Sequence, residues 1–235
     1  MPEICVYALA EGGLGRIGIR GIAGEALRAV RVGAIDAVIG RVSRIPRPTE
    51  RNLRRHGRVV SALWRRTPAL LPARFGTAVG DVAELEAIVG ARQKTLRRTL
   101  RSVRHRAQMT VRMLSGSGTR DSGLGTRDSG RGRISSPGSR VPDPGSRGRS
   151  YLHARVADAQ RARDVPGFAA CRHAVKAWVR AERVEKRGRV ATIYHLVPRG
   201  SAGRYRAALE RAAAGAQVRM LVSGPWPPYA FADTL

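Results

Sequence analysis

The stretch "VSGPWPPYAF" (Val222–Phe231) holds three prolines and three aromatic residues in a chain of which only 5% is aromatic. Proline fixes φ near −65° and has no backbone N–H, and it pushes the residue before it towards extended geometry. A strand predicted for "QVRMLVS" must therefore stop at Gly224, and a stiff segment then carries Trp226, Tyr229 and Phe231. Because a stiff segment loses little entropy when it docks, we predict a rigid clamp that packs on the protein's own core or on a partner.

The composition bounds the class of protein. A length of 235 residues suggests one large domain or two small ones, and 43% hydrophobic residues argue against wholesale disorder. The 44 Lys and Arg residues against 17 Asp and Glu give a net charge of +27. Such a charge favours polyanions, anionic lipid or an acidic protein partner, but it does not specify a fold.

Several other classes are disfavoured by the sequence. The two cysteines, Cys5 and Cys171, are too few for a disulfide framework and lack zinc-type spacing. The start "MPEICVYALA" has no basic region and contains Glu3, so it does not resemble a signal peptide. No apolar run approaches the ~18 residues of a membrane span. We therefore expect a soluble, cytoplasmic protein without a membrane partner.

The first 114 residues alternate between strand and helix patterns. We predict a buried strand at Ile4–Leu9, a hairpin around Gly33 and a helix capped by Thr49. A strand and turn follow in "ALLPARFGT", then a long helix from Asp81, then a strand at 107–114 that closes this half. The apolar sides of the two helices are Leu53, His56, Val60, Leu63 and Trp64 in the first and Leu85, Val89, Leu96, Leu100 and Val103 in the second.

The segment from Ser115 to Ser150 differs in kind, because it holds nine glycines, nine serines and three prolines. Such a composition cannot offset its ordering entropy by burial, so we assign 115–147 as a disordered linker or insertion. The hexapeptide "GTRDSG" occurs in it twice without an apolar seam, which makes it a local duplication. The predicted domains are therefore 1–114 and 148–235.

The second domain also mixes helices and strands. We predict a strand-to-helix entry at 148–164, a helix at 168–186, a strand at 189–197, a helix at Ser201–Ala214 and a strand at 217–223. The fold class is therefore α+β in both halves.

The chemical motifs are weak. "GLGRIG" matches the dinucleotide-binding pattern, but Gly18, Gly21 and Gly24 would interrupt the helix that this site needs, so we predict a loop. The five histidines are scattered, without metal-ligand spacing, and each is best read as a surface or satisfied core residue. No nucleophile comes with a base and an acid. We expect no catalytic residue, cofactor or metal, and no small-molecule substrate.

The region 91–112 is strongly basic, with eight Lys or Arg residues and no acid. It could bind phosphates, but it contains no aromatic residue for base stacking, so a solvated helix face is the preferred interpretation. A basic nucleic-acid-binding protein that uses 91–112 and the arginine-rich linker remains the alternative function.

Several segments, in order along the chain, resemble the gas vesicle protein GvpL/GvpF family. "GPWPPYAF" is similar to that family's closing signature, and "LPARFGT" after "ERNLRRHGRVVSALW" is similar to its central motif. "GRSYLHAR" resembles the motif that opens its second half, and "GIRGIAGEALRAV" with "IDAVIGRV" resembles its beginning. The resemblance covers nearly the whole chain except 115–147.

The resemblance implies a modified ferredoxin-like α/β sandwich followed by an α+β domain with a helical hairpin. It implies a non-enzymatic accessory or minor structural protein of gas vesicle formation, found on the vesicle or in the cytoplasm. Its partners would be the hydrophobic shell protein and other vesicle accessory proteins. The residues it nominates as fold-defining or as an interface are Leu71, Pro72, Arg74, Phe75, Gly76, Thr77, Gly148, Tyr151, Leu152, Arg155, Gly224, Pro225, Trp226, Pro227, Pro228, Tyr229 and Phe231.

Overall fold

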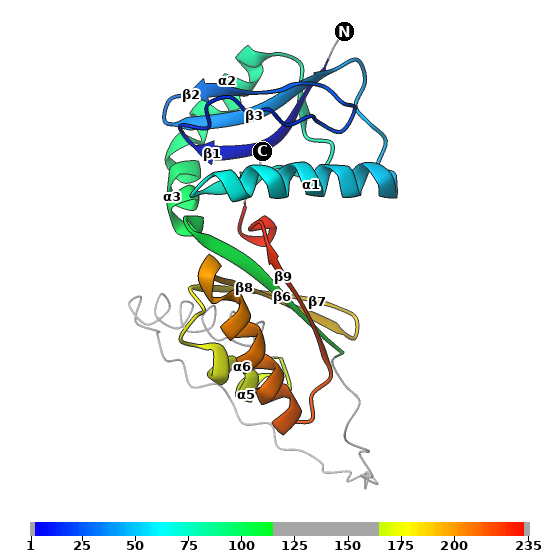
Figure 1. Cartoon of the computed structure of the whole chain (residues 1–235), viewed down its shortest axis with the longest axis vertical. Coiled ribbons are helices and arrows are strands. Elements are labelled where there is room, and N and C mark those ends of the chain that lie inside the picture. Colours follow the sequence, from blue (N-terminus) through cyan, green and yellow to red (C-terminus); the bar gives the residue numbers. More distant parts are fainter. Residues whose placement is uncertain (1–2, 115–164, 233–235) are drawn as a thin grey trace, which may run out of the picture.

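Two antiparallel sheets, one from each half of the chain, organise the computed structural model, which describes residues 3–114 and 165–232 (Figure 1). The two-part α+β architecture is the predicted one. The predictions for 115–164, which include the linker, the "GTRDSG" duplication and the strand-to-helix entry at 148–164, lie outside the described residues.

The first sheet is built around a central strand. Its order is β2-β3-β1-β4, and a short β5 also pairs with β1. The strands are β1 (Glu3–Glu11), β2 (Leu27–Val32), β3 (Ile35–Val42), β4 (Leu70–Pro72) and β5 (Ala78–Val79). β1 is buried without interruption from Ile4 to Ala10, as a strand covered on both faces must be. The predicted hairpin is confirmed, and Gly33 takes its turn at φ +58.

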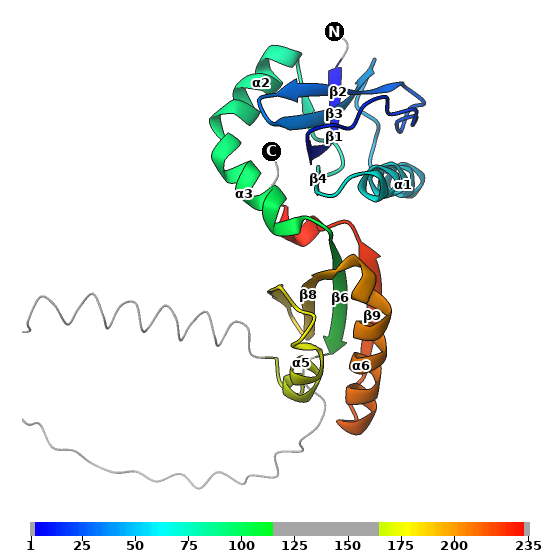
Figure 2. The same ribbon diagram turned by 60° about the vertical axis from the view of Figure 1, so that its left-hand side comes forward.

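Helix α1 (Glu50–Arg66) covers one face of this sheet (Figure 2). Thr49 caps it, as predicted, because its hydroxyl accepts a hydrogen bond from the Asn52 N–H at 3.3 Å. Four of the five predicted inward residues are buried, together with Val59. Leu53 is the exception at 46% exposed, because the buried contacts of α1 begin only at His56.

Helices α2 (Val82–Ala91) and α3 (Gln93–Val103) cover the other face. The prediction of one continuous helix is wrong, since the backbone leaves helical geometry at Arg92. The predicted apolar side is nevertheless fully buried on both helices. Five basic side chains of this stretch, for which a solvated helix face is the preferred interpretation, are exposed: Lys94, Arg97, Arg98, Arg101 and Arg104.

The second sheet has the order β7-β8-β6-β9. Its strands are β6 (Arg106–Leu114), β7 (Ala181–Arg187), β8 (Val190–Pro198) and β9 (Met220–Trp226), and helices α5 (Ala169–Val175) and α6 (Ala202–Gly215) pack on one face. The predictions of β8 and α6 are confirmed. The prediction that 107–114 closes the first half is wrong, because the partners of β6 are β8 and β9.

The predicted helix at 168–186 is wrong beyond Val175. Residues Ala181–Arg187 form β7 instead, an edge strand that pairs along its whole length with β8. Its charged sequence favours a helix locally, but pairing with a distant strand overrides that preference.

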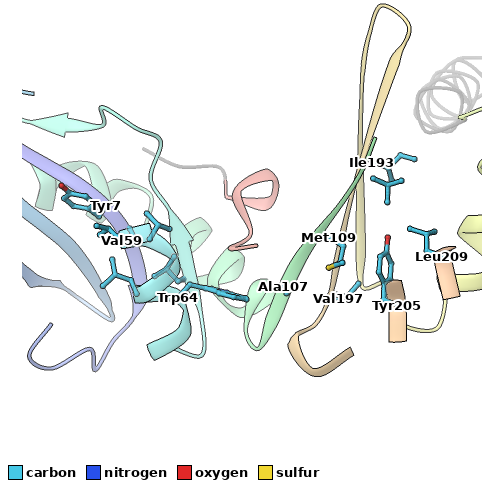
Figure 3. Packing of buried hydrophobic residues seen from close by; sticks show 14 of the residues in the cluster. Tyr7, Val59, Trp64, Ala107, Met109, Ile193, Val197, Tyr205 and Leu209 are labelled. Carbon is cyan, nitrogen blue, oxygen red and sulfur yellow. The ribbon is translucent and has the colours of Figure 1, made fainter. Parts of the chain in front are cut away.

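The two halves share their buried clusters. α3 runs through His105 into β6, and the His105 N–H donates to the Pro68 carbonyl at 2.7 Å. Figure 3 shows Tyr7, Val59 and Trp64 of the first half in the same apolar cluster as residues of the second half. A cation also bridges the halves, since the Arg199 guanidinium lies 4.3 Å from the Trp64 ring centre and donates to the Thr67 carbonyl at 2.9 Å.

Candidate interaction site

The proline segment, Gly224–Phe231, continues the second sheet towards the first half (Figure 1). The prediction that the strand stops at Gly224 is wrong, because β9 extends to Trp226, which pairs with Gln108. Two features allow the strand to pass Pro225. β9 is an edge strand, and the register shifts between Gln108 and Thr110.

Gly224 has a specific role in this passage. Its φ is +119, and a Cβ there would lie 2.7 Å from the Gln108 carbonyl oxygen, so only glycine fits. Arg206 of α6 holds the same stretch, because its guanidinium donates to the Gly224 carbonyl at 2.8 Å and to the Val222 carbonyl at 3.2 Å. The proline segment therefore leaves the sheet along a fixed path.

The far end of the proline segment is anchored in the core. Phe231, in the short helix η2 (Tyr229–Phe231), is only 6% exposed and shares an apolar cluster with Leu71 of β4. The Ala230 N–H donates to the Gln108 side-chain oxygen at 2.7 Å. The predicted clamp on the core is therefore found at Phe231, and Pro227 and Pro228 are buried beside it.

The other two aromatic residues lie at the surface. Trp226 is 46% exposed and Tyr229 is 38% exposed, so of the three rings only Phe231 packs in the core. Trp226 directly precedes and Tyr229 directly follows the buried pair Pro227 and Pro228. Partial burial raises the pKa of Tyr229 from 10 to about 12.

These rings form one side of a groove whose other side is α1. We call it the α1 groove; its volume is about 900 Å³. Its lining residues are Ile19, Arg20, Arg54, Arg55, Gly57, Arg58, Val59, Ser61, Ala62, Arg65, Trp226, Pro227 and Tyr229. The groove thus combines apolar side chains from both halves with a set of arginines from the loop after β1 and from α1.

The central motif "LPARFGT" has a structural role. Leu71 and Pro72 are buried in β4, and the chain turns at Gly76, whose φ is +84. The Thr77 carbonyl then accepts from the Val6 N–H at 2.9 Å, which fastens the turn to β1. Phe75 is half-buried with its ring edge-on to His56, whereas Arg74 is exposed.

The motif at 148–155, with Gly148, Tyr151, Leu152 and Arg155, lies outside the described residues. The structure therefore brings together two of the nominated motifs, through the apolar cluster that contains Leu71 and Phe231. It does not bring the exposed Arg74 or Gly76 to the α1 groove.

A polar network is buried in the second half. His195 is fully buried, its Nδ1 lies 2.7 Å from the Tyr205 hydroxyl, and its Nε2 lies 2.8 Å from Glu182. Arg172 donates to the same carboxylate at 3.0 Å. Burial alone would raise the pKa of Glu182, but the hydrogen bonds from His195 and Arg172 outweigh it and lower the pKa to about 2. This histidine is a satisfied core residue, as predicted.

The glycine-rich stretch after β1 is a loop, as predicted, and no helix opens there. The N–H groups of Gly13 and Leu14 donate to the buried carboxylate of Asp36 at 2.6 and 3.1 Å, and Arg31 pairs with the same group. The described residues contain no group of three His, Cys, Asp or Glu that could hold a metal ion. Among the same residues, no helix is long and apolar enough to cross a membrane.

The described residues form a two-part α+β protein with a partly apolar groove between α1 and the proline segment. The family model described as gas vesicle synthesis protein GvpL/GvpF matches residues 4–233. The chain therefore belongs to this family, and its role lies in gas vesicle synthesis. A search of curated proteins finds no match in sequence.

Two solved structures share the fold. The crystal structure of the gas vesicle protein GvpF from Anabaena sp. PCC7120 is similar with a TM-score of 0.69 and 12% identity, over 100% of this chain and 98% of that chain. GvpF from Microcystis aeruginosa is similar with a TM-score of 0.70 and 12% identity, over 99% of both chains. At this identity the likeness shows the fold alone.

The basic residues that line the groove were not predicted from the sequence. The predicted basic surface is 91–112, whereas the groove is lined by Arg54, Arg55, Arg58 and Arg65 of α1. The signal was present, since "ERNLRRHGRVVSALWRR" is as rich in arginine as the region chosen. No local signal could have identified Arg199, because its partners Trp64 and Thr67 come from the other half.

Proposed function

We propose that this protein is a non-enzymatic accessory or minor structural component of gas vesicle formation. It acts by non-covalent binding to the hydrophobic shell protein and to other vesicle assembly proteins. Membership of the gas vesicle synthesis family supports the assignment of this role to gas vesicles. The observation that carries the binding role is the pair of half-exposed aromatic rings, Trp226 and Tyr229, held on a fixed backbone at the α1 groove.

The physical need for such a protein follows from the shell. A shell subunit with one exposed hydrophobic face is prone to aggregate before it is assembled. A protein with a preformed aromatic surface can cover that face, or present it to the growing wall. Aromatic residues are common anchors of such interfaces because they bury a large area at a small cost in entropy.

The preformed state of the surface supports tight binding. The proline segment is fixed at Gly224 by Arg206 and at Ala230 by Gln108, so its backbone has little freedom left to lose. The partner therefore meets two rings that are already oriented. The protein would act at the vesicle surface or in the surrounding cytoplasm.

The test is capture of purified shell protein by the immobilised full chain, with and without the double substitution Trp226→Ala and Tyr229→Ala. We expect at least tenfold weaker capture by this variant, and loss of vesicle formation when it replaces the natural chain in cells. Leu221→Ala on the same strand is the matched control, because Leu221 is 63% exposed and outside the groove. Equal capture by all three proteins would contradict the proposed role of the rings.

A further inference from the structure

We infer that the α1 groove binds an acidic, amphipathic α-helix of a partner protein. That a partner protein occupies the groove rests on the proposed function. The inference adds the chemistry of the partner segment that binds there. Three properties of the groove carry it: the charge of its rim, its apolar floor and its shape along α1.

The rim of the groove is positively charged and unbalanced. Five arginines line it, namely Arg20, Arg54, Arg55, Arg58 and Arg65, and no Asp or Glu lies among the described residues of the lining. The only carboxylate that pairs with one of these arginines within the described residues is Glu50, at 2.5 Å from Arg54. Both members of that pair are about three-quarters exposed, so the pair is weak and does not compete with an incoming carboxylate.

The floor of the groove is apolar and comes from both halves of the molecule. Ile19 and Val59 lie on the side of the first half, and Trp226 and Pro227 lie on the other side. A wholly polar acidic ligand would satisfy the arginines but would leave this floor exposed to water. The ligand that fits both has carboxylates beside apolar side chains.

The α1 side of the groove has a low, open surface. Gly57 and Ser61 lie four residues apart on one side of the helix, next to Ala62. A Cβ added at Gly57 would meet no atom within 4 Å, so the space above the helix is open. Glycine inside a helix costs roughly 1 kcal/mol relative to alanine, and the missing side chain at Gly57 leaves additional space beside the helix.

The groove also has the length of a short helix. It follows α1 from Arg54 to Arg65, which is roughly 16 Å at 1.5 Å per residue and accommodates about three turns of a second helix. Arg54, Arg58 and Arg65 recur at spacings that keep them along one side. They can therefore pair with carboxylates that recur every three or four residues on the partner helix.

The same features disfavour a nucleic acid in this groove. Single strands are held by rings on which successive bases stack, and by cations that follow the backbone. Here the two rings lie together at one side, and the rest of the apolar lining is aliphatic and offers no further base-stacking surface. The arrangement suits a segment that carries carboxylates beside aliphatic side chains.

The direct test uses a labelled 18-residue peptide of Leu, Ala and Glu, with leucines on one helical side and glutamates on its flanks. A matched peptide carries Lys in place of every Glu. Binding to the full chain is measured by fluorescence anisotropy. We expect the acidic peptide to bind and the basic peptide not to bind. Equal binding of both peptides, or of neither, would overturn the inference.

Charge reversal locates the site. In Arg58→Glu with Arg65→Glu we expect at least tenfold weaker binding of the acidic peptide and new binding of the basic peptide. The control variant, Arg97→Glu with Arg101→Glu, makes the same change in net charge on the exposed side of α3. An equal loss in both variants would show that only the overall field of the protein attracts the peptide.

Shape is tested at one position. Gly57→Phe fills the open space and should abolish peptide binding, whereas Gly57→Ala should leave it within twofold. A single-stranded oligonucleotide is tested in the same way. If it displaces the acidic peptide and Gly57→Phe abolishes its binding, then the ligand of the groove is a nucleic acid and the inference is overturned.

The failures of the two proposals are distinguishable. If the acidic peptide binds in the groove but the shell protein is not captured, then the shell partner is wrong and the acidic-helix inference stands. If the shell protein is captured through Trp226 and Tyr229 while the acidic peptide does not bind, then the inference fails and the proposed function stands.

Discussion

The two halves of the molecule bury their sheets in different ways. β1 of the first half is buried on both faces between α1 and the pair α2 and α3. β6 of the second half turns Met109 and Val111 towards α5 and α6. On its other face Gln108 and Thr110 are buried near the proline segment, whereas Arg112 and Leu114 are exposed. The first half is therefore a closed sandwich, and the second sheet is covered on one face and only partly on the other.

The buried histidines show the same contrast. His56 of the first half is held by rings alone, with the Tyr7 and Phe75 centroids each 5.7 Å away, and its Nε2 has no hydrogen-bond partner among the described residues. His195 of the second half has a partner on each nitrogen. The two buried histidines are therefore held differently, His56 by aromatic contacts and His195 by hydrogen bonds.

The largest expected effect on stability comes from loss of the contact between the proline segment and the first half. Phe231→Ala removes the buried anchor by which the proline segment joins the cluster of the first half. We expect a loss of about 3–5 kcal/mol in the free energy of unfolding, as for other buried aromatic residues. Urea unfolding followed by circular dichroism measures it. Leu221→Ala should change the value by no more than about 0.5 kcal/mol, and a similar loss in both variants would contradict the anchoring role.

A second prediction concerns acid. Burial lowers the pKa of His56 from 6.5 to about 4, so the unfolded chain takes up a proton between these values before the folded chain does. The stability contributed by neutral His56 is present above pH 6.5 and is lost as the pH falls towards 4. We expect a loss of about 2 kcal/mol between pH 7 and pH 5. The variant His56→Phe should not show this loss, and an unchanged pH dependence in it would assign the acid sensitivity elsewhere.

The second half should respond at lower pH. The pKa of Glu182 is about 2, so its contribution is present above its unfolded value of 4.5 and is lost only as the pH falls below that value. At neutral pH, Glu182→Gln should cost about 1–2 kcal/mol, because Arg172 and His195 lose a charged acceptor. The same variant should flatten the stability curve below pH 4.5. A curve parallel to that of the natural chain would refute this assignment.

The smallest expected effect is a gain. Gly57→Ala should raise the free energy of unfolding by about 0.5–1 kcal/mol, because alanine favours the helix and its Cβ meets no atom within 4 Å. Thermal unfolding at neutral pH measures the shift in Tm. A loss of stability would mean that the surface of α1 at this position is not open.

Local patterns predicted most elements of the fold. The apolar periods of α1, α2 and α3, the hairpin at Gly33 and the cap at Thr49 depend on neighbours in sequence, and nearly all are confirmed. The failures depend on distant partners. β7 is a strand only because β8 lies beside it, and β6 belongs to the second sheet because of β8 and β9.

The site was predicted in part for the same reason. The proline pattern identified the stiff segment and its three rings, but the exposure of Trp226 depends on the position of α1, which is more than 150 residues away in sequence. The arginines of the groove are unremarkable in a chain of net charge +27 until the fold places them around an apolar floor.

The shared cluster of Leu71 and Phe231 also sets an order of events during synthesis. Leu71 is translated 160 residues before Phe231, because 231 − 71 = 160. At roughly 5–20 residues per second, the ribosome needs about 8–32 s to cover that interval. During that interval, the apolar surface of the first half that Phe231 covers in the folded protein is exposed to water. The cluster is complete only after Phe231 has been synthesised.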